Sequence, residues 1–284
     1  MKEIIHYIVS RLETHYPADE ATALAWWIAE ETTGCTRTRL QFDCKDTTIF
    51  SNLQAGTPFL EEIIDRLLHD EPIQYIFGHS LWNGLDIKVT PATLIPRPET
   101  AELVDQIHKT AGIIQTENAP FRVLDIGTGS GCIAIALKKA HPEWQVLGID
   151  ISAEAVEIAK ENAQRNGVEV DFKVADIFAN IPDFNGVFDL VVSNPPYICE
   201  SEKKDMRPNV LAHEPSAALF VPDDDPLRFY RRIVQSRMGE RLYFEINEAY
   251  PEEMKTLMCA NGYTDIIVTN DIYGKPRIIQ GRMA

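Results

Sequence analysis

The four residues Asn194-Pro195-Pro196-Tyr197 are the part of the sequence best suited to chemistry. They follow an apolar run at residues 187–192, which predicts a buried strand that ends where the motif begins. The two prolines prevent the strand from continuing and hold the backbone rigid. The Asn194 side-chain oxygen and the Pro195 carbonyl could accept the two N–H bonds of a planar NH₂ group, with Tyr197 stacked on its face. The motif predicts a catalytic and substrate-binding corner, although a plain strand-to-loop turn also fits it.

A planar NH₂ group is a poor nucleophile because its lone pair is delocalised. Holding such a nitrogen against an electrophilic carbon would therefore supply most of the rate enhancement, for which positioning is worth up to about 7–11 kcal/mol. The exocyclic amine of adenine and the side-chain amide of glutamine both present this group. The motif by itself does not separate these two substrates.

A glycine-rich turn follows the predicted strand at residues 122–126 and precedes a predicted helix at residues 132–139. Glycines let a ligand approach the backbone, and the helix start offers unpaired N–H groups. The dinucleotide pattern GxGxxG is not met, because its third glycine falls on Cys132. An acid before the turn would repel a pyrophosphate but suits an ammonium group. We therefore expect a cofactor site rather than a structural turn, formed by Asp125, Gly127, Thr128, Gly129, Ser130 and Gly131.

Two further acids follow predicted strands. Asp150 ends the apolar run at residues 146–149, where a carboxylate could accept both hydroxyls of a ribose. The alternative is that Asp150 only caps the next helix together with Ser152. Asp176 comes after a third strand and could accept a hydrogen bond from an adenine amine, with Ile177 packing on the ring, or it could be an ordinary loop acid.

The secondary structure that must position these residues is predicted to change near residue 100, from mainly helical to alternating strands and helices. Helical periodicity dominates residues 1–72, with an N-cap and first-turn proline at Thr57-Pro58. Residues 74–82 and 85–89 flank Asn83-Gly84 and predict a hairpin, and the proline-rich residues 90–100 predict an ordered linker. After that, strands at residues 122–126, 146–149, 187–192 and 242–246 alternate with helices at 132–139, 153–166 and 251–260. This alternation predicts an α/β doubly wound sheet, whose last strands, at 266–269 and 277–280, are too close for a helical crossover and should form an antiparallel hairpin.

Composition narrows the class of protein. The net charge is −16, and the longest basic runs are pairs such as Lys203-Lys204, which disfavours nucleic acid as the direct partner. No run approaches the roughly 20 apolar residues of a membrane span, and the first residues do not resemble a signal peptide. The five cysteines, at positions 35, 44, 132, 199 and 259, are scattered, and the histidines show no paired spacing. We therefore expect a cytoplasmic protein without disulfides or a metal.

The glycine turn, the acids after the second and third strands and the final hairpin together resemble the Rossmann-type class I methyltransferases that use S-adenosyl-L-methionine. The resemblance covers residues 100–284. It implies that the glycine turn holds the methionine part of the cofactor, Asp150 the ribose, and Asp176 and Ile177 the adenine.

Further stretches resemble one family within that class, the HemK/PrmC protein-(glutamine-N5) methyltransferases. The matching segments are YIFG (75–78), IPRPET (95–100), DIGTGSGCIAIAL (125–137), SNPPYI (193–198), HEPSAALF (213–220), FYRRI (229–233), FEI (244–246) and DIYG (271–274) through Arg277. Departures occur at Ala101, at Asn247 and at VPDDDP (221–226), where the family usually has other residues.

This resemblance implies methyl transfer to the glutamine of the GGQ motif in peptide chain release factors, and so a role in translation termination. It implies a helical substrate-binding domain at residues 1–73, a hairpin and linker at 74–99, and a methyltransferase domain at 100–284. Asn194 would contact both cofactor and substrate. Arg97 and Glu214 could contact substrate or form structural ion pairs, and the role of Glu245 is open. We expect a monomer.

Three other functions are weighed against this one. An adenine-N6 methyltransferase acting on nucleic acid would share the Asn-Pro-Pro-Tyr motif, but the acidic balance and the lack of a target-recognition domain disfavour it. A non-catalytic cofactor-binding protein would leave the motif without a purpose. A nicotinamide dehydrogenase fits the fold but not the glycine spacing or Asp125.

Overall fold

The computed structural model describes residues 1–42, 53–111, 120–179 and 186–284. These residues form two compact units. The first contains Met1–Gly78 together with Arg207–His213, and the second contains His79–Met206 together with Glu214–Ala284.

The first unit is helical. Its helices are α1 (Lys2–Leu12), α2 (Ala18–Thr33), α3 (Arg37–Phe42), α4 (Pro58–Leu68), α5 (Ile73–Phe77) and α9 (Pro208–His213). Apolar residues at helical spacing, such as Ile8 and Leu12 on α1 and Ile64 on α4, are fully buried in one core. Thr57 is the N-cap of α4 and Pro58 its first residue, which confirms the predicted start of that helix.

The N-terminal segment of the first unit extends to Gly78, whereas the expected domain boundary is at residue 73. Residues 74–77 were predicted to belong to a hairpin strand, and this is wrong, because they form α5. Pro72 precedes this helix and Gly78 ends it in the left-handed region at φ 76°. The apolar side chains of α5 pack on the helical core, so tertiary contacts outweigh the strand-like composition of this stretch.

The hairpin itself is present in the second unit. It joins β1 (His79–Trp82) to the antiparallel strand β2 (Leu85–Lys88). Asn83 and Gly84 make the turn with φ of 47° and 72°, the positive values that a two-residue turn requires. Residues 89–97 then lead without helix or strand to α6 (Pro98–Ala111), so the predicted linker ends before Pro98 rather than at residue 100. Proline is well tolerated at a helix start.

Within the described part of the chain, a seven-stranded sheet in the order β10-β11-β9-β6-β3-β4-β5 forms the centre of the second unit. Its strands are β3 (Arg122–Ile126), β4 (Gln145–Asp150), β5 (Asp171–Val174), β6 (Phe188–Ser193), β9 (Gly239–Glu245), β10 (Tyr263–Asn270) and β11 (Pro276–Met283). The strands β5, β4, β3, β6 and β9 are parallel to one another. The strand β11 lies antiparallel between β9 and β10, which confirms the predicted C-terminal hairpin at the sheet edge.

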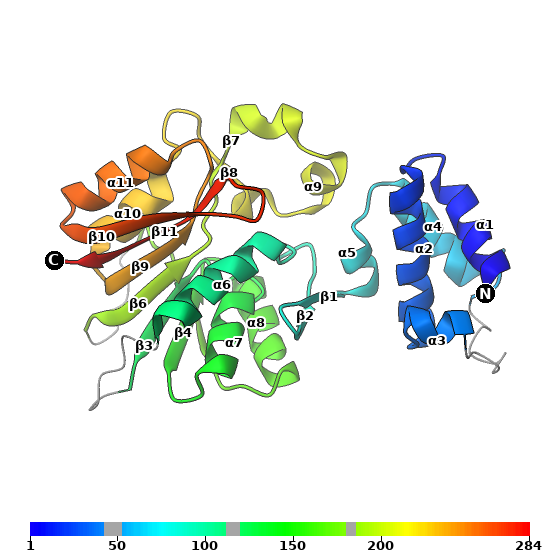
Figure 1. Cartoon of the computed structure of the whole chain (residues 1–284), viewed down its shortest axis with the longest axis horizontal. Helices are drawn as coiled ribbons and strands as arrows, with labels where there is room; N and C mark the ends of the chain where they lie inside the picture. The colour runs from blue at the N-terminus through cyan, green and yellow to red at the C-terminus, as the bar shows by residue number, and fades with distance from the viewer. Residues whose placement is uncertain (43–52, 112–119, 180–185) are drawn as a thin grey trace. The chain divides into compact units, whose positions relative to one another are not determined.

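The other helices of this unit are α7 (Cys132–Ala140), α8 (Ala153–Arg165), α10 (Arg228–Ser236) and α11 (Pro251–Ala260). From β3 the chain winds outward through α7 and α8, and from β6 it winds in the opposite direction through α10 and α11. Because such crossovers are right-handed, the two pairs of helices cover opposite faces of the sheet (Figure 1). Tyr230 and Ile233 of α10 and Met254 of α11 bury their side chains against the sheet.

Between β6 and α10 the chain forms a short two-stranded parallel sheet of β7 (Ile198–Cys199) and β8 (Phe220–Val221). Two short 3₁₀ helices, Glu200–Asp205 and Ser216–Ala218, also lie in this stretch. Cys35, Cys132, Cys199 and Cys259 are free thiols, and Cys44 lies outside the described residues. A search of the described helices finds none with the length and apolar character that crossing a membrane would require.

Candidate active site

The predicted site residues follow strands that end at one edge of the central sheet. The parallel register places Ile126 beside both Ile149 and Ser193, so the glycine turn, Asp150 and Asn194 follow neighbouring strand ends. Ser193 Oγ donates a 2.7 Å hydrogen bond to the Ile126 carbonyl, which fixes the two strand ends to each other. Ligands of open α/β sheets bind outside this carboxyl edge.

The glycine turn has the backbone geometry that its sequence predicts. Gly127, Gly129 and Gly131 have φ of 70°, 54° and 80°, where residues with side chains are strained. A Cβ atom at Gly127 or Gly129 would meet no described atom within 4 Å, so the backbone is open to a ligand there. A Cβ at Gly131 would lie 3.0 Å from the Ala159 Cβ, so this glycine allows α7 to pack closely on α8.

Asp125 lies fully buried beneath the turn. The Thr128 hydroxyl donates a 2.6 Å hydrogen bond to Asp125 Oδ2, whereas Oδ1 is buried and has no hydrogen-bond partner among the described residues. Burial raises the pKa of this carboxyl to about 7, against the opposing effect of the Thr128 hydrogen bond. A buried acceptor without a donor is costly and fits a cationic N–H group. The side chains of Thr128 and Ser130 are themselves buried, so these two residues present mainly backbone to a ligand.

Asp150 connects the turn to the second strand end. Its Oδ2 accepts the Gly129 N–H at 2.9 Å and its Oδ1 accepts the Ser152 N–H at 2.9 Å. Ser152 is the N-cap of α8, because its hydroxyl accepts the Ala155 N–H at 3.2 Å. Asp150 therefore orders the glycine turn as well as the start of α8. A carboxylate has about four lone-pair sites, so both oxygens keep capacity for a further donor.

Arg232, a residue of α10, holds the segment that follows β5. Asp176 Oδ1 accepts the Phe178 N–H at 2.8 Å, and the Ile177 side chain is buried. Arg232 Nε donates to the Ile177 carbonyl, and Arg232 Nη2 donates to the Ala179 carbonyl at 3.2 Å. The arginine on α10 thus fixes the backbone on which the two predicted adenine-contacting residues lie.

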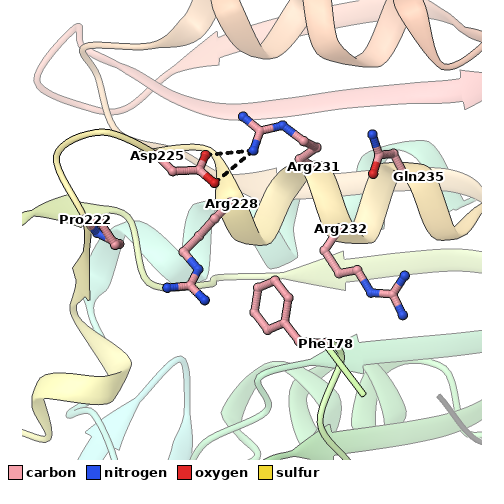
Figure 2. A pocket seen from close by; sticks show the side chains of 7 residues that line it. All are labelled: Phe178, Pro222, Asp225, Arg228, Arg231, Arg232 and Gln235. Atoms are coloured by element: carbon pink, nitrogen blue, oxygen red, sulfur yellow. Dashed lines mark hydrogen bonds and ion pairs between the residues drawn. The ribbon is translucent and has the colours of Figure 1, made fainter. Parts of the chain in front are cut away.

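Arg232 also lines a shallow cavity of about 330 Å³ beside this segment (Figure 2). The lining residues are Phe178, Pro222, Asp225, Arg228, Arg231, Arg232 and Gln235. The Arg231 guanidinium pairs with Asp225 at 2.8 Å, and the Arg228 guanidinium lies 4.9 Å from the centre of the Phe178 ring. None of the predicted site residues lines this cavity, so it is separate from the predicted cofactor and substrate positions.

The Asn-Pro-Pro-Tyr corner is tied to a buried acid. Asn194 Nδ2 donates a 3.1 Å hydrogen bond to Thr100 Oγ1, and Thr100 Oγ1 donates a 2.7 Å hydrogen bond to Glu245 Oε2. The Tyr197 hydroxyl donates to Glu245 Oε1 at 3.0 Å. Pro195 is buried, whereas Asn194, Pro196 and Tyr197 are partly exposed. Tyr197 is therefore anchored through its hydroxyl.

Glu245 is the polar centre of this corner and was not predicted as a site residue. Its side chain is 1% exposed, and burial raises the pKa of its carboxyl. The hydrogen bonds from Thr100 and Tyr197, and the positive charge of Arg277, act in the opposite direction and favour the ionised form. The Tyr230 hydroxyl holds the backbone here by donating to the Glu245 carbonyl at 2.8 Å.

Arg277 is positioned by the turn between β10 and β11. Its Nε donates to Asp271 Oδ2 at 3.1 Å, and its Nη1 donates to the Ile246 carbonyl at 3.3 Å. Asp271 Oδ1 accepts the backbone N–H groups of Tyr273 and Lys275, both at 3.0 Å. Residues 271–277, which resemble the HemK/PrmC family in sequence, thus hold the positively charged guanidinium of Arg277 near Glu245.

Arg97 and Glu214 form an ion pair with each other, 2.5 Å between Arg97 Nη2 and Glu214 Oε1. The Glu214 side chain is buried and also accepts the Ile95 N–H at 3.4 Å. The Arg97 carbonyl accepts a 2.7 Å hydrogen bond from the Trp82 indole. The geometry therefore supports a structural ion pair between Arg97 and Glu214 rather than a contact with substrate.

Thr100, Glu245 and Arg232 were missed as site residues by sequence reasoning. Each lay inside a stretch that matched the HemK/PrmC family, but nothing in the local pattern distinguished a support from a surface residue. An acid inside an otherwise apolar strand, as at Glu245, was the one usable signal, because charged residues are seldom fully buried unless they are paired.

The chain matches two family models and several known proteins. Residues 3–78 match a family model described as the PrmC N-terminal domain, and residues 104–218 match one described as the methyltransferase small domain. A release factor glutamine methyltransferase of Bacteroides thetaiotaomicron is 45% identical to this chain over 98% of the chain and 99% of its own length. One of Flavobacterium psychrophilum is 43% identical over 78% of each. The chain belongs to the release factor glutamine methyltransferase family.

The resemblance to this family that the motifs indicated is therefore confirmed. The class I methyltransferase fold is confirmed as well. The hMettl16 catalytic domain in complex with MAT2A 3′UTR hairpin 6 has a TM-score of 0.56 and 17% identity, covering 71% of this chain and 76% of that one. The N-terminal domain of human METTL16 in complex with SAH has a TM-score of 0.52 at 17% identity, with the same coverage. At such identities the likeness concerns the fold alone.

Proposed function

We propose that this protein transfers a methyl group from S-adenosyl-L-methionine to the side-chain amide nitrogen of the glutamine in the GGQ motif of peptide chain release factors. The observation that carries the proposal is the position of the Asn-Pro-Pro-Tyr corner. It follows the strand next to the glycine turn, in a chain that matches release factor glutamine methyltransferases from end to end. The modification would act on translation termination.

The residues at the sheet edge suit the cofactor. Asp125 Oδ1, which is buried and has no hydrogen-bond partner within the described ranges, offers an acceptor for an ammonium group, and the open backbone at Gly127 and Gly129 lets a ligand approach the turn. We assign the methionine part to the turn at residues 127–131, the ribose to Asp150, and the adenine to Asp176 and Ile177. When bound, S-adenosyl-L-methionine supplies an electrophilic methyl carbon on a sulfonium.

The substrate residues orient a weak nucleophile. The lone pair of a glutamine amide nitrogen is delocalised into its carbonyl group. Asn194 Oδ1 and the Pro195 carbonyl accept its two N–H bonds and so favour localisation of the lone pair on nitrogen. Tyr197 and Pro196 flank the amide plane, and the Glu245 hydrogen bond keeps the Tyr197 ring in place. No strong general base is needed, because the methylated nitrogen is acidic enough to lose its proton readily.

The first unit is the proposed contact surface for the release factor. It corresponds to the segment that matches the PrmC N-terminal domain. We further propose that the protein acts as a monomer in the cytoplasm without binding nucleic acid directly. The net charge of −16 is consistent with a protein substrate rather than a phosphate backbone.

The test is methyl transfer by the purified protein. Mass spectrometry of release factors incubated with the protein and cofactor should show one added methyl group, located on the GGQ glutamine. A release factor whose GGQ glutamine is replaced by alanine should stay unmodified, and Asn194→Ala should abolish transfer. An unmodified release factor alongside methylated DNA or RNA would instead establish the adenine-N6 methyltransferase function. Light scattering of the purified protein tests the monomer.

A further inference from the structure

Four polar side chains connect the substrate corner to the interior in one continuous chain of hydrogen bonds. Asn194 is joined to Thr100, Thr100 to Glu245, and Glu245 to Tyr197, with donor–acceptor distances of 3.1, 2.7 and 3.0 Å. Thr100 and Glu245 are 3% and 1% exposed, so water does not compete for these bonds. The choice of donor and acceptor in each of the three bonds therefore depends on the other two.

For an ionised Glu245, counting protons fixes the direction of each bond. An ionised carboxylate has no proton, so Glu245 accepts from both hydroxyl groups. The Thr100 hydroxyl has one proton, which it gives to Glu245, and its oxygen has only acceptor capacity left for Asn194. Asn194 must therefore turn its NH₂ group toward Thr100. Its carbonyl oxygen, which bonds to no other described residue, is left for the substrate.

The opposite direction would disable the corner. A protonated Glu245 could donate to Thr100, and Thr100 could then donate to the Asn194 carbonyl oxygen. The Asn194 NH₂ group would face the substrate NH₂ group, and two donors cannot bond to each other. Burial has the largest effect on the Glu245 carboxyl and raises its pKa, as does the negative charge of Glu99. The hydrogen bonds from both hydroxyls and the positive charge of Arg277 lower this pKa and stabilise the ionised form.

We propose that Thr100 and Glu245 are positioning residues that hold the Asn194 amide with its oxygen toward the substrate nitrogen. The proposal rests on the proposed function, since it explains how the acceptor used there is oriented. Neither residue touches the reacting atoms. As the substrate nitrogen gives up its lone pair, its N–H bonds become more acidic, so the bond to the Asn194 oxygen strengthens toward the transition state. Loss of the orientation therefore lowers kcat more than it raises KM.

The test compares two threonines of the same helix. Thr100→Val removes the hydroxyl that orients Asn194 while keeping the side-chain shape, and Thr100→Ser restores it. Thr110→Val is the matched control, because it breaks a 2.7 Å hydrogen bond between Thr110 and Tyr243 that does not involve the corner. Steady-state kinetics are measured with a release factor, and the Kd of S-adenosyl-L-methionine is measured by calorimetry as a test of folding.

Thr100→Val should lower kcat about ten- to hundredfold, the scale of a misplaced polar contact near the reaction. Its KM and cofactor Kd should change less than about threefold. Thr100→Ser and Thr110→Val should keep kcat within about threefold of the wild type. Glu245→Gln removes the fixed direction, since an amide can donate to or accept from Thr100, and kcat should fall to between the wild-type and Thr100→Val values.

Two results would overturn the proposal on its own. One is a Thr100→Val variant that binds the cofactor normally and has the kcat of Thr110→Val. The other, decisive even if Thr100→Val does not fold, is a Glu245→Gln variant with the wild-type kcat. A wild-type protein that transfers no methyl group to any release factor overturns the proposed function, and the orientation proposal with it.

Discussion

Replacing Asp125 with asparagine should make the protein more stable at high pH than at low pH relative to the wild type. Burial raises the pKa of this carboxyl from 3.8 to about 7, so the folded protein binds a proton that the unfolded chain has already lost. The neutral acid stabilises the fold fully below the unfolded pKa. This contribution is lost as pH rises through about 7. An asparagine has no proton to lose, so its contribution stays constant.

The size of the effect follows from the same pKa. Between about pH 5 and about pH 8 the wild type loses stability only until Asp125 ionises near pH 7. That interval is roughly two pH units, each worth about 1.4 kcal/mol. The difference in the free energy of unfolding between Asp125→Asn and the wild type should therefore widen by about 3 kcal/mol across this range. Ionisable groups that do not interact with Asp125 contribute equally to both proteins and cancel.

Urea unfolding at the two pH values, without cofactor, measures this difference. At about pH 8, where Asp125 is ionised, Asp125→Asn should also raise the Kd of S-adenosyl-L-methionine at least about tenfold, because it removes the negative charge proposed to face the ammonium group. A pH-independent stability difference for Asp125→Asn would refute the reasoning.

Two further substitutions test the supports of the cofactor site. Arg232→Ala frees the backbone after β5 and should raise the cofactor Kd several-fold, whereas Arg231→Ala on the same helix should leave it unchanged; equal binding by both variants in calorimetry would contradict this role. Gly148→Ala places a methyl carbon 2.6 Å from the Phe172 ring and should lower the unfolding free energy by about 1–3 kcal/mol in urea titrations. Gly167→Ala adds backbone strain but no steric clash, so it should lower the unfolding free energy by less, about 1 kcal/mol. A larger loss of stability for Gly167→Ala than for Gly148→Ala would contradict the role of crowding at Gly148.

Most strands of the sheet could be predicted because they contain a short apolar run bounded by polar or glycine residues, whereas β5, with the sequence DFKV, contains no such run. The predicted range 122–126 coincides with β3, and the strand-end acids follow from the parallel arrangement. The helix α5 could not be predicted in this way, since its sequence IQYIF has strand-like composition and becomes helical through contacts with the helical core. The start of α6 was hidden by the prolines before it, because Pro98 is a helix residue rather than the end of a linker.

The candidate site also contains residues that could be predicted from the sequence and residues that could not. The glycine turn and the Asn-Pro-Pro-Tyr corner are continuous in sequence, so their residues could be named in advance. The support beneath them joins residues that are far apart, such as Thr100 and Glu245, which are separated by 145 positions. No periodicity or spacing connects such a pair, and which of two hydroxyls an acid will meet is decided only when the sheet and α6 pack together.

The reversed direction of β11 determines which end of that strand can serve the chemistry. Ile278 pairs with Glu245, the last residue of β9, so the strand begins where its neighbour finishes. Arg277, which directly precedes Ile278, lies near Glu245 for this reason. A strand running the same way as β9 would have carried its first residues to the far rim of the sheet. The reversed direction thus places the start of β11 at the edge of the sheet where the other six strands end, and it brings a positively charged guanidinium to that edge.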